Sequence, residues 1–154
     1  MPKTQYLIPL LLILLLSVTI SCKKNKAGQG TKTSAYNDQS SHNVGTACMS
    51  CHGNGGDNPF WWTVAGTVYK PDTTLLGVNS TIYLYTKING SGTVVVLLPV
   101  DAKGNFYTTS YFDFGDGLYP QVKSPSGEVR YMQSSTKDGN CNNCHNRTRR
   151  IIVN

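Results

Sequence analysis

Charged side chains are scarce in this protein, and acidic ones especially so. The chain has 14 lysines and arginines but only 8 aspartates and glutamates, and charged residues make up 14% of its 154 positions. This composition excludes the charge-rich disordered class. The carboxylates lie mostly in turn-like contexts, and no nucleophile–histidine couple or phosphate-binding loop accompanies them. The sequence therefore does not favour an enzyme that works by acid–base or nucleophilic catalysis.

Long apolar runs are also missing, with one exception near the N-terminus. Lys3 precedes a mostly apolar stretch at residues 7–20, which is shorter than the roughly 20 residues of a membrane-spanning helix. This pattern is typical of an export signal. The stretch leads into T-I-S-C at residues 19–22, which resembles a bacterial lipobox with threonine where leucine is usual. We expect Cys22 to be lipidated and the protein to be anchored to a bacterial membrane, facing the periplasm or the cell surface. An uncleaved anchor and an ordinary secretory signal are the alternatives.

The segment after Cys22 has little to bury. Residues 23–41 are rich in Lys, Gly, Gln, Thr, Ser and Asn. They predict a flexible tether between the signal at residues 1–22 and a folded domain at residues 42–154. A flexible chain of this length has an end-to-end distance of about 25 Å, which is enough to hold the domain off a membrane surface.

Cysteine is used sparingly, and every copy has an interpretation. Besides Cys22 there are four cysteines, in two C-x-x-C-H sequences at residues 48–52 and 141–145. Unused cysteine pairs in an exported protein would normally form disulfides. C-x-x-C-H is instead the attachment sequence of c-type haem, in which two thiols reach the porphyrin vinyl groups and the histidine ligates the iron. We predict two covalent haem c groups, one on Cys48, Cys51 and His52 and one on Cys141, Cys144 and His145.

Two other uses of paired cysteines match the sequence less well. A zinc ion held by four cysteines usually joins pairs that are much closer in sequence than these two, which residues 53–140 separate. Such a site would also leave both histidines unexplained. A redox-active C-x-x-C disulfide occurs in a thioredoxin-like βαβ context, and no such pattern surrounds either pair. Both readings remain alternatives to haem.

Histidine is too scarce to supply every axial ligand. With His52 and His145 assigned, only His42 is left of the three histidines, and it lies six residues before Cys48. Small multihaem cytochromes often carry a histidine close upstream of the motif. We predict that His42 completes bis-histidine ligation of the first haem. Ligation of the second haem, or an exposed polar role, are the alternatives.

No histidine then remains for the second haem. Met132, nine residues before Cys141, is the best candidate for a thioether ligand, and a role in the core is the equal alternative. Methionine would raise the reduction potential of this haem relative to a bis-histidine haem. Without it the iron would be open to small molecules, which is the basis of an alternative function as a haem peroxidase or small-molecule reductase.

Aromatic and basic residues flank the motifs. The F-W-W run at residues 60–62 would either cover a porphyrin face or begin the core. The arginines at 147, 149 and 150 would either pair with haem propionates or form a solvated tail. Removal of Lys3 with the signal leaves +5 of the net +6, and four propionates contribute roughly −4. A nucleic-acid partner is therefore not expected.

The region between the motifs predicts strands. Val, Thr, Ile and Tyr alternate between turn signals, which gives candidate strands at residues 62–70, 80–87, 93–98, 106–110, 118–123 and 128–133. Pro120 makes the strand at 118–123 an edge strand at best. The pattern predicts a mainly β fold, a single antiparallel β-sandwich flanked by two haem-binding segments. Neither motif shows helical periodicity, so each is expected to be a single helical turn or an irregular loop.

Three short segments carry a resemblance to a known family. The G-T-V-Y at residues 66–69, residues 77–84 and the D-A-K-G-N-F at 101–106 resemble the transthyretin-like, carboxypeptidase-regulatory type of sandwich, over about half of the chain. With the lipobox and both motifs, the chain resembles a small dihaem or multihaem c-type cytochrome lipoprotein. That resemblance implies electron transfer outside the cytoplasm, with redox proteins as partners. A protein- or glycan-binding sandwich with accessory haems is the other possibility.

Overall fold

The computed structural model describes residues 31–53, 56 and 60–154. The predicted signal and the lipidation site at Cys22 lie outside the described residues. Among those that are described, no helix is long and apolar enough to cross a membrane.

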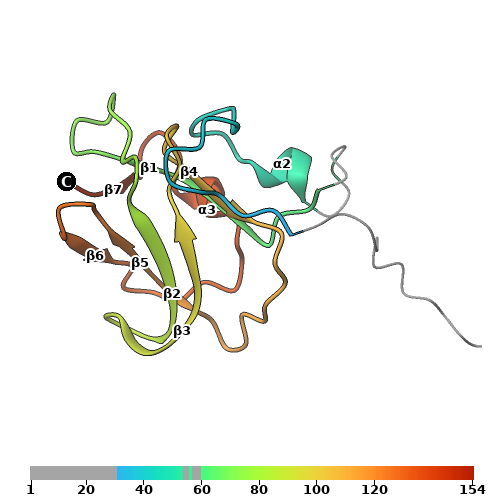
Figure 1. The fold of residues 1–154 in the computed structure, drawn as a ribbon. Coiled ribbons are helices and arrows are strands. Elements are labelled where there is room, and N and C mark those ends of the chain that lie inside the picture. Colours follow the sequence, from blue (N-terminus) through green and yellow to red (C-terminus); the bar gives the residue numbers. More distant parts are fainter. Residues whose placement is uncertain (1–30, 54–55, 57–59) are drawn as a thin grey trace, which may run out of the picture.

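The chain folds into two β-sheets (Figure 1). The first has the order β4-β1-β7, and its strands are Asn105–Thr108, Val64–Tyr69 and Ile151–Ile152. The second has the order β3-β2-β5-β6, with strands Ser91–Pro99, Thr81–Lys87, Tyr119–Lys123 and Val129–Tyr131. This confirms the predicted mainly β fold, and two sheets are compatible with a sandwich. The antiparallel prediction fails at one place, because β7 pairs with β1 in parallel.

The apolar core draws on both sheets. Val68 of β1 and Phe106 of β4 belong to the same buried cluster as Leu84 of β2 and Leu98 of β3. All six predicted strands are present, with ends within two residues of those expected. Only β7 was not predicted, because a two-residue strand is too short to show alternation.

Pro120 does not lie in an edge strand, contrary to the prediction. Its strand β5 lies between β2 and β6, and Pro120 itself is paired with Leu84 of β2. The carbonyl of Pro120 accepts a hydrogen bond from the amide of Met132, at 2.9 Å. The nitrogen and the carbonyl of Pro120 both point toward β6, and β6 ends at Tyr131, before it reaches the position opposite Pro120. The missing amide donor therefore costs little.

The folded domain also begins earlier than residue 42. Thr33 pairs with Thr108 of β4, and the amide of Ser34 donates to the carbonyl of Tyr107 at 3.0 Å. Ser34 is 3% exposed, and the Tyr36 hydroxyl lies 2.7 Å from the Thr81 hydroxyl. Residues 33–36 are therefore part of the domain rather than of a tether, because their backbone adds to the edge of β4. A polar composition does not reveal such pairing.

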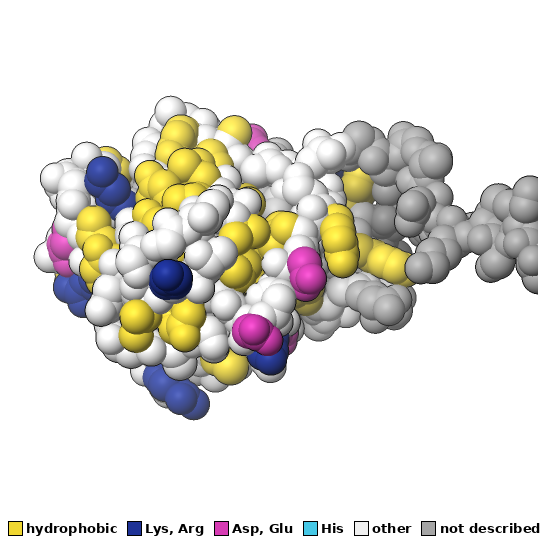
Figure 2. Space-filling view, turned by 90° about the horizontal axis from the view of Figure 1, so that it is seen from below, with side chains coloured by type: hydrophobic (Ala, Val, Ile, Leu, Met, Phe, Trp, Pro, Cys, Tyr) yellow, Lys and Arg dark blue, Asp and Glu magenta, His cyan; other side chains and the backbone are white. Residues whose placement is uncertain are grey.

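The surface is mixed in character. Figure 2 shows one face, on which hydrophobic side chains are interspersed with a few charged ones of both signs. Val94 and Leu97 of the edge strand β3 are exposed, and Tyr111 in the loop between β4 and β5 is 89% exposed. Phe112 and Phe114 of the same loop pack against the core.

Candidate functional site

Both C-x-x-C-H sequences form a single helical turn, which is one of the two forms expected from the sequence. The turns are α2, Met49–His52, and α3, Cys141–Cys144. In each, the amide of the histidine donates to the carbonyl of the first cysteine, over 3.0 Å at His52 and 2.8 Å at His145. One helical turn brings residues i and i+3 onto the same face. The two thiols of each motif therefore lie on one side of their turn, with the histidine following.

Each motif histidine is oriented by a backbone carbonyl. The Nδ1 of His52 lies 3.1 Å from the carbonyl oxygen of Phe60, and the Nδ1 of His145 lies 2.7 Å from that of Arg149. A carbonyl can only accept, so Nδ1 carries a proton in both rings, and in the neutral imidazole this leaves the lone pair on Nε2. Metal-ligating histidines typically have this second hydrogen bond, which fixes the tautomer and the ring plane. Both residues therefore fit the role of an iron ligand.

His42 is the nearest candidate partner of His52. Their ring centres are 5.9 Å apart, with 42° between the planes. Two imidazoles on opposite sides of one metal have ring centres roughly 6 Å apart, because a metal–nitrogen bond is about 2 Å and the nitrogen lies about 1 Å from the ring centre. Both histidines line one small cavity together with Cys48, Cys51 and Trp62. The structure thus brings together the residues predicted for the first haem.

The surroundings of His52 favour its neutral form. His52 is 8% exposed, and burial lowers the pKa of its imidazole despite the hydrogen bond to Phe60. Trp62 meets His52 edge-on at 4.7 Å and Tyr107 at 3.8 Å between ring centres. The buried Nε1 of Trp62 has no hydrogen-bond partner within the described part of the chain. Trp62 therefore belongs to this site and offers a donor to a bound group, whereas Trp61 is exposed.

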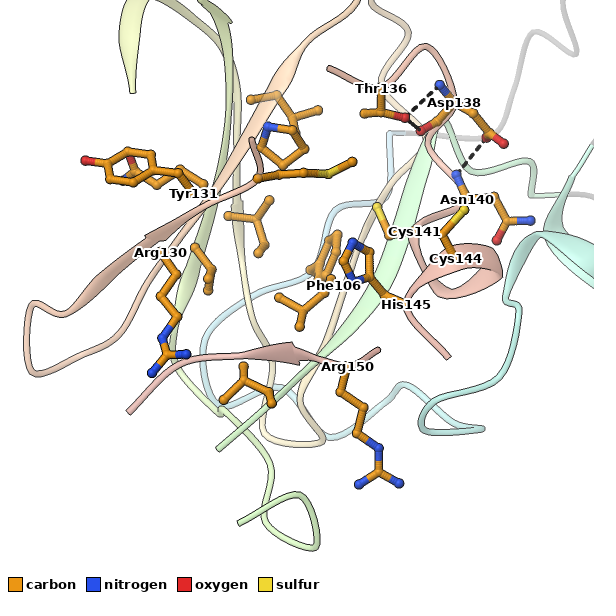
Figure 3. Close-up of a pocket in the computed structure, with 18 residues that line it drawn as sticks. Phe106, Arg130, Tyr131, Thr136, Asp138, Asn140, Cys141, Cys144, His145 and Arg150 are labelled. Atoms are coloured by element: carbon orange, nitrogen blue, oxygen red, sulfur yellow. Dashed lines mark hydrogen bonds between the residues drawn. The ribbon is translucent and has the colours of Figure 1, made fainter. Parts of the chain in front are cut away.

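A larger pocket, of about 320 Å³, adjoins the second motif. Its volume falls in the range of about 300–1,000 Å³ that is common for cofactor and ligand sites. Figure 3 shows Cys141, Cys144 and His145 of the α3 segment on one side of it, with Phe106 beside His145 and Tyr131 on the far side. Its other apolar lining residues are Ile82, Leu84, Pro120, Val122, Met132, Ile151 and Ile152, and its polar ones are Gln121, Arg130, Thr136, Asp138, Asn140 and Arg150. An apolar slot beside two thiols and an oriented imidazole suits a porphyrin.

Met132 lines this same pocket. It follows β6 directly, and its amide is bonded to Pro120, so the position of its backbone is fixed by the sheet. The side chain is half-buried, and Met132 is not a member of the apolar core cluster. The residue predicted as the sixth ligand of the second haem therefore shares a pocket with His145.

Cys141 is held against the sheet by close packing. Its side chain packs on the core cluster, and a Cβ added at Gly66 of β1 would lie 2.9 Å from the Cβ of Cys141. Only glycine at position 66 leaves room for the turn to approach so closely. Burial raises the pKa of the Cys141 thiol to about 12, with smaller contributions from Asp138 and Cys48. The thiol is therefore protonated near neutral pH.

The four motif cysteines are free thiols in this structure. None of Cys48, Cys51, Cys141 and Cys144 is in a disulfide. Within residues 31–53, 56 and 60–154, no three His, Cys, Asp or Glu side chains are grouped closely enough to hold a metal ion.

No protein-family model, curated protein or solved structure matches this chain. The resemblance to transthyretin-like sandwiches and to dihaem cytochromes therefore stays a prediction.

The arginines after the second motif have separate roles. The guanidinium of Arg150 lies 4.4 Å from the centre of the Tyr69 ring and bonds to the carbonyl of Thr73. Figure 3 shows it pointing away from Cys141 and Cys144. Arg147 and Arg149 are exposed. Arg150 thus secures the C-terminal segment to the domain, and the other two lie on the surface as a solvated tail would.

Sequence reasoning missed one residue of this region, Asn142. It occupies a variable position of C-x-x-C-H, so its type gave no signal. It is nevertheless 3% exposed, and its side chain reaches the first motif, with Nδ2 lying 3.9 Å from the Sγ of Cys48. The two motifs, distant in sequence, are therefore neighbours in space.

Proposed function

We propose that this protein is a dihaem c-type cytochrome, exported as a lipoprotein, that carries electrons outside the cytoplasm. The observation that carries the proposal is a repeated geometry. Two C-x-x-C-H turns each present paired thiols and a histidine whose Nδ1 is bonded to a carbonyl. Each turn also has one further ligand-type side chain within its own cavity, His42 at the first and Met132 at the second.

The cysteines would attach the haems by addition. Each thiol would add across one vinyl group, so that sulfur would bond to one carbon and the proton would pass to the other. Nothing leaves, and no oxidant or reductant is consumed. Cys48 and Cys141 are half-buried, whereas Cys51 and Cys144 are exposed. The first thiol of each motif would thus hold the haem close to the domain, and the second would hold it at the surface.

Bound haem supplies an iron that takes up and releases one electron at a time. His52 and His145 would hold the two irons, and the cavities around them would limit access of water. Histidine would be the sixth ligand of one iron and methionine the sixth ligand of the other. The two haems would then have different reduction potentials, since a methionine ligand raises the potential. Such a pair suits stepwise transfer between redox proteins.

The test is haem attachment to the full chain with its own leader, in a host that matures c-type cytochromes. We expect two haems per chain by pyridine haemochrome assay and by intact mass. Replacing Cys48 and Cys51 with serine should leave one haem, and so should replacing Cys141 and Cys144. Replacing Cys22 with serine should release the protein from the membrane fraction without loss of haem. A wild-type chain that matures without haem would overturn the proposal.

A further inference from the structure

We infer that Asn142, although it lies in the second motif, positions the first haem site; this inference rests on the proposed function. Asn142 lies between Cys141 and Cys144, within the second motif. Its side chain points away from the pocket of its own motif and toward the segment that carries His42 and Cys48.

Both the Oδ1 and the Nδ2 of Asn142 form hydrogen bonds to residues outside the second motif. Its Oδ1 accepts from the amide of Thr67 at 3.0 Å. Its Nδ2 donates to the carbonyl of Thr46 at 2.8 Å and to the Thr67 hydroxyl at 3.0 Å. Thr46 lies two residues before Cys48, so one side chain joins the second motif to the approach to the first.

Thr67 extends the connection. Its hydroxyl also accepts from the amide of Gly45 at 3.1 Å and donates to Oδ1 of Asn105 at 2.7 Å. The Nδ2 of Asn105 in turn lies 3.0 Å from the Ser41 hydroxyl and 3.3 Å from the carbonyl of His42. Asn142, Thr67 and Asn105 are 3%, 0% and 3% exposed. A fully satisfied buried network of this kind specifies a single arrangement.

The network attaches the segment that precedes the first motif to the rest of the domain, together with a hydrogen bond from Lys103 Nζ to the carbonyl of Ser41 at 2.9 Å. Residues 41–48 belong to no strand. The hydrogen bonds from Thr67, Asn105 and Asn142 attach this segment to β1, β4 and α3. They thereby fix where His42 stands relative to His52. Loss of Asn142 would leave the buried amide of Thr67 without its partner, which is costly, and would remove the bond that ties the exposed residue Thr46 to α3.

The decisive experiment compares Asn142→Ala with Asn143→Ala in the haem-loaded full chain. Asn143 is its exposed neighbour in the same motif. We expect Asn142→Ala to change the spectrum and spin state of the first haem and to shift its potential. Asn143→Ala should leave that haem unchanged. The signals of the two haems are assigned beforehand from the paired cysteine-to-serine variants. An effect of Asn142→Ala confined to the second haem, or no effect with both haems bound, would overturn the inference.

Two further measurements guard against misfolding and against failure of haem attachment. Thr67→Val changes neither motif but removes the hydroxyl that Asn142 and Gly45 share, so it should perturb the first haem in the same way. In the haem-free chain, Asn142→Ala should speed hydrogen exchange of the Thr67 amide, and Asn143→Ala should not. Unchanged Thr67 exchange would count against the network even if no haem binds. A wild-type chain without haem would sink only the proposed function.

Discussion

The imidazole rings of His42 and His52 lie 5.9 Å apart between centres, close to the spacing of two ligands of one metal. They come from different local structures, since His52 ends the α2 turn and His42 lies in the segment that precedes it. What holds them at this separation is a set of contacts to β1 and β4 rather than the nine residues between them.

His42→Ala should change the first haem from a six-coordinate low-spin state to a high-spin state. The reason is that no other histidine is left to replace His42 in this chain. Electron paramagnetic resonance of the oxidised protein would measure the change. Asn43→Ala, an exposed neighbour, is the control. A first haem that stays low-spin with an unaltered potential in His42→Ala would show that His42 is not its ligand.

Met132→Ala should lower the potential of the second haem and open its iron to carbon monoxide. The thioether stabilises ferrous iron, so its removal favours the ferric state. A redox titration and the spectral change on adding carbon monoxide to the reduced protein would report both effects. Gln133→Ala, at the next and exposed position, should behave as wild type. If the wild-type protein already binds carbon monoxide at this haem, Met132 is packing and not a ligand.

The thiols of the haem-free chain should differ in reactivity. With a pKa of about 12, Cys141 is almost entirely protonated at pH 8, and the thiolate is the species that reacts. Cys144, which is exposed, should therefore be alkylated by iodoacetamide at least about tenfold faster. Peptide mapping after timed labelling would give the two rates. The rate at Cys141 should rise as the pH increases, and equal rates at pH 8 would contradict the burial of this thiol.

Ser34→Ala should destabilise the domain by about 1–3 kcal/mol, the cost of leaving buried polar groups without partners. The Ser34 hydroxyl donates to the carbonyl of Pro99 at 2.6 Å and accepts from the amide of Tyr107 at 3.1 Å. Urea unfolding would measure the loss. Gln39→Ala, exposed in the same segment, should change stability by less than about 0.5 kcal/mol. Equal stability of the two variants would indicate that residues 31–41 belong to a tether and not to the folded domain.

The local features of this protein follow from its sequence. Six strands were predicted from alternation and turn residues, because those signals act over only a few positions. The absence of helical periodicity around each C-x-x-C-H limited it to a single helical turn or an irregular loop, and the structure has the turn. The chemical types of the candidate ligands, including His42 and Met132, could also be selected, since few histidines and methionines are available.

Contacts between distant segments could not be predicted in this way. Residues 33–36 were predicted to belong to a tether because their composition is polar. They pair with β4 through their backbone, which side-chain composition does not reveal. Pro120 was expected in an edge strand because proline has no amide hydrogen to donate. Only the structure shows that β6 ends beside Pro120, so that the missing donor costs little.

The sequence by itself predicts which residues would hold haem, because two thiols and a histidine at fixed spacing form one local unit. It did not determine how the two units are placed relative to each other. Only the tertiary structure decided that Asn142 of one motif lies against Cys48 of the other. The physical reason is that this placement depends on β1, where Thr67 bonds to both segments and Gly66 leaves room for Cys141 to approach. A pattern along the sequence does not show which distant segments a strand contacts.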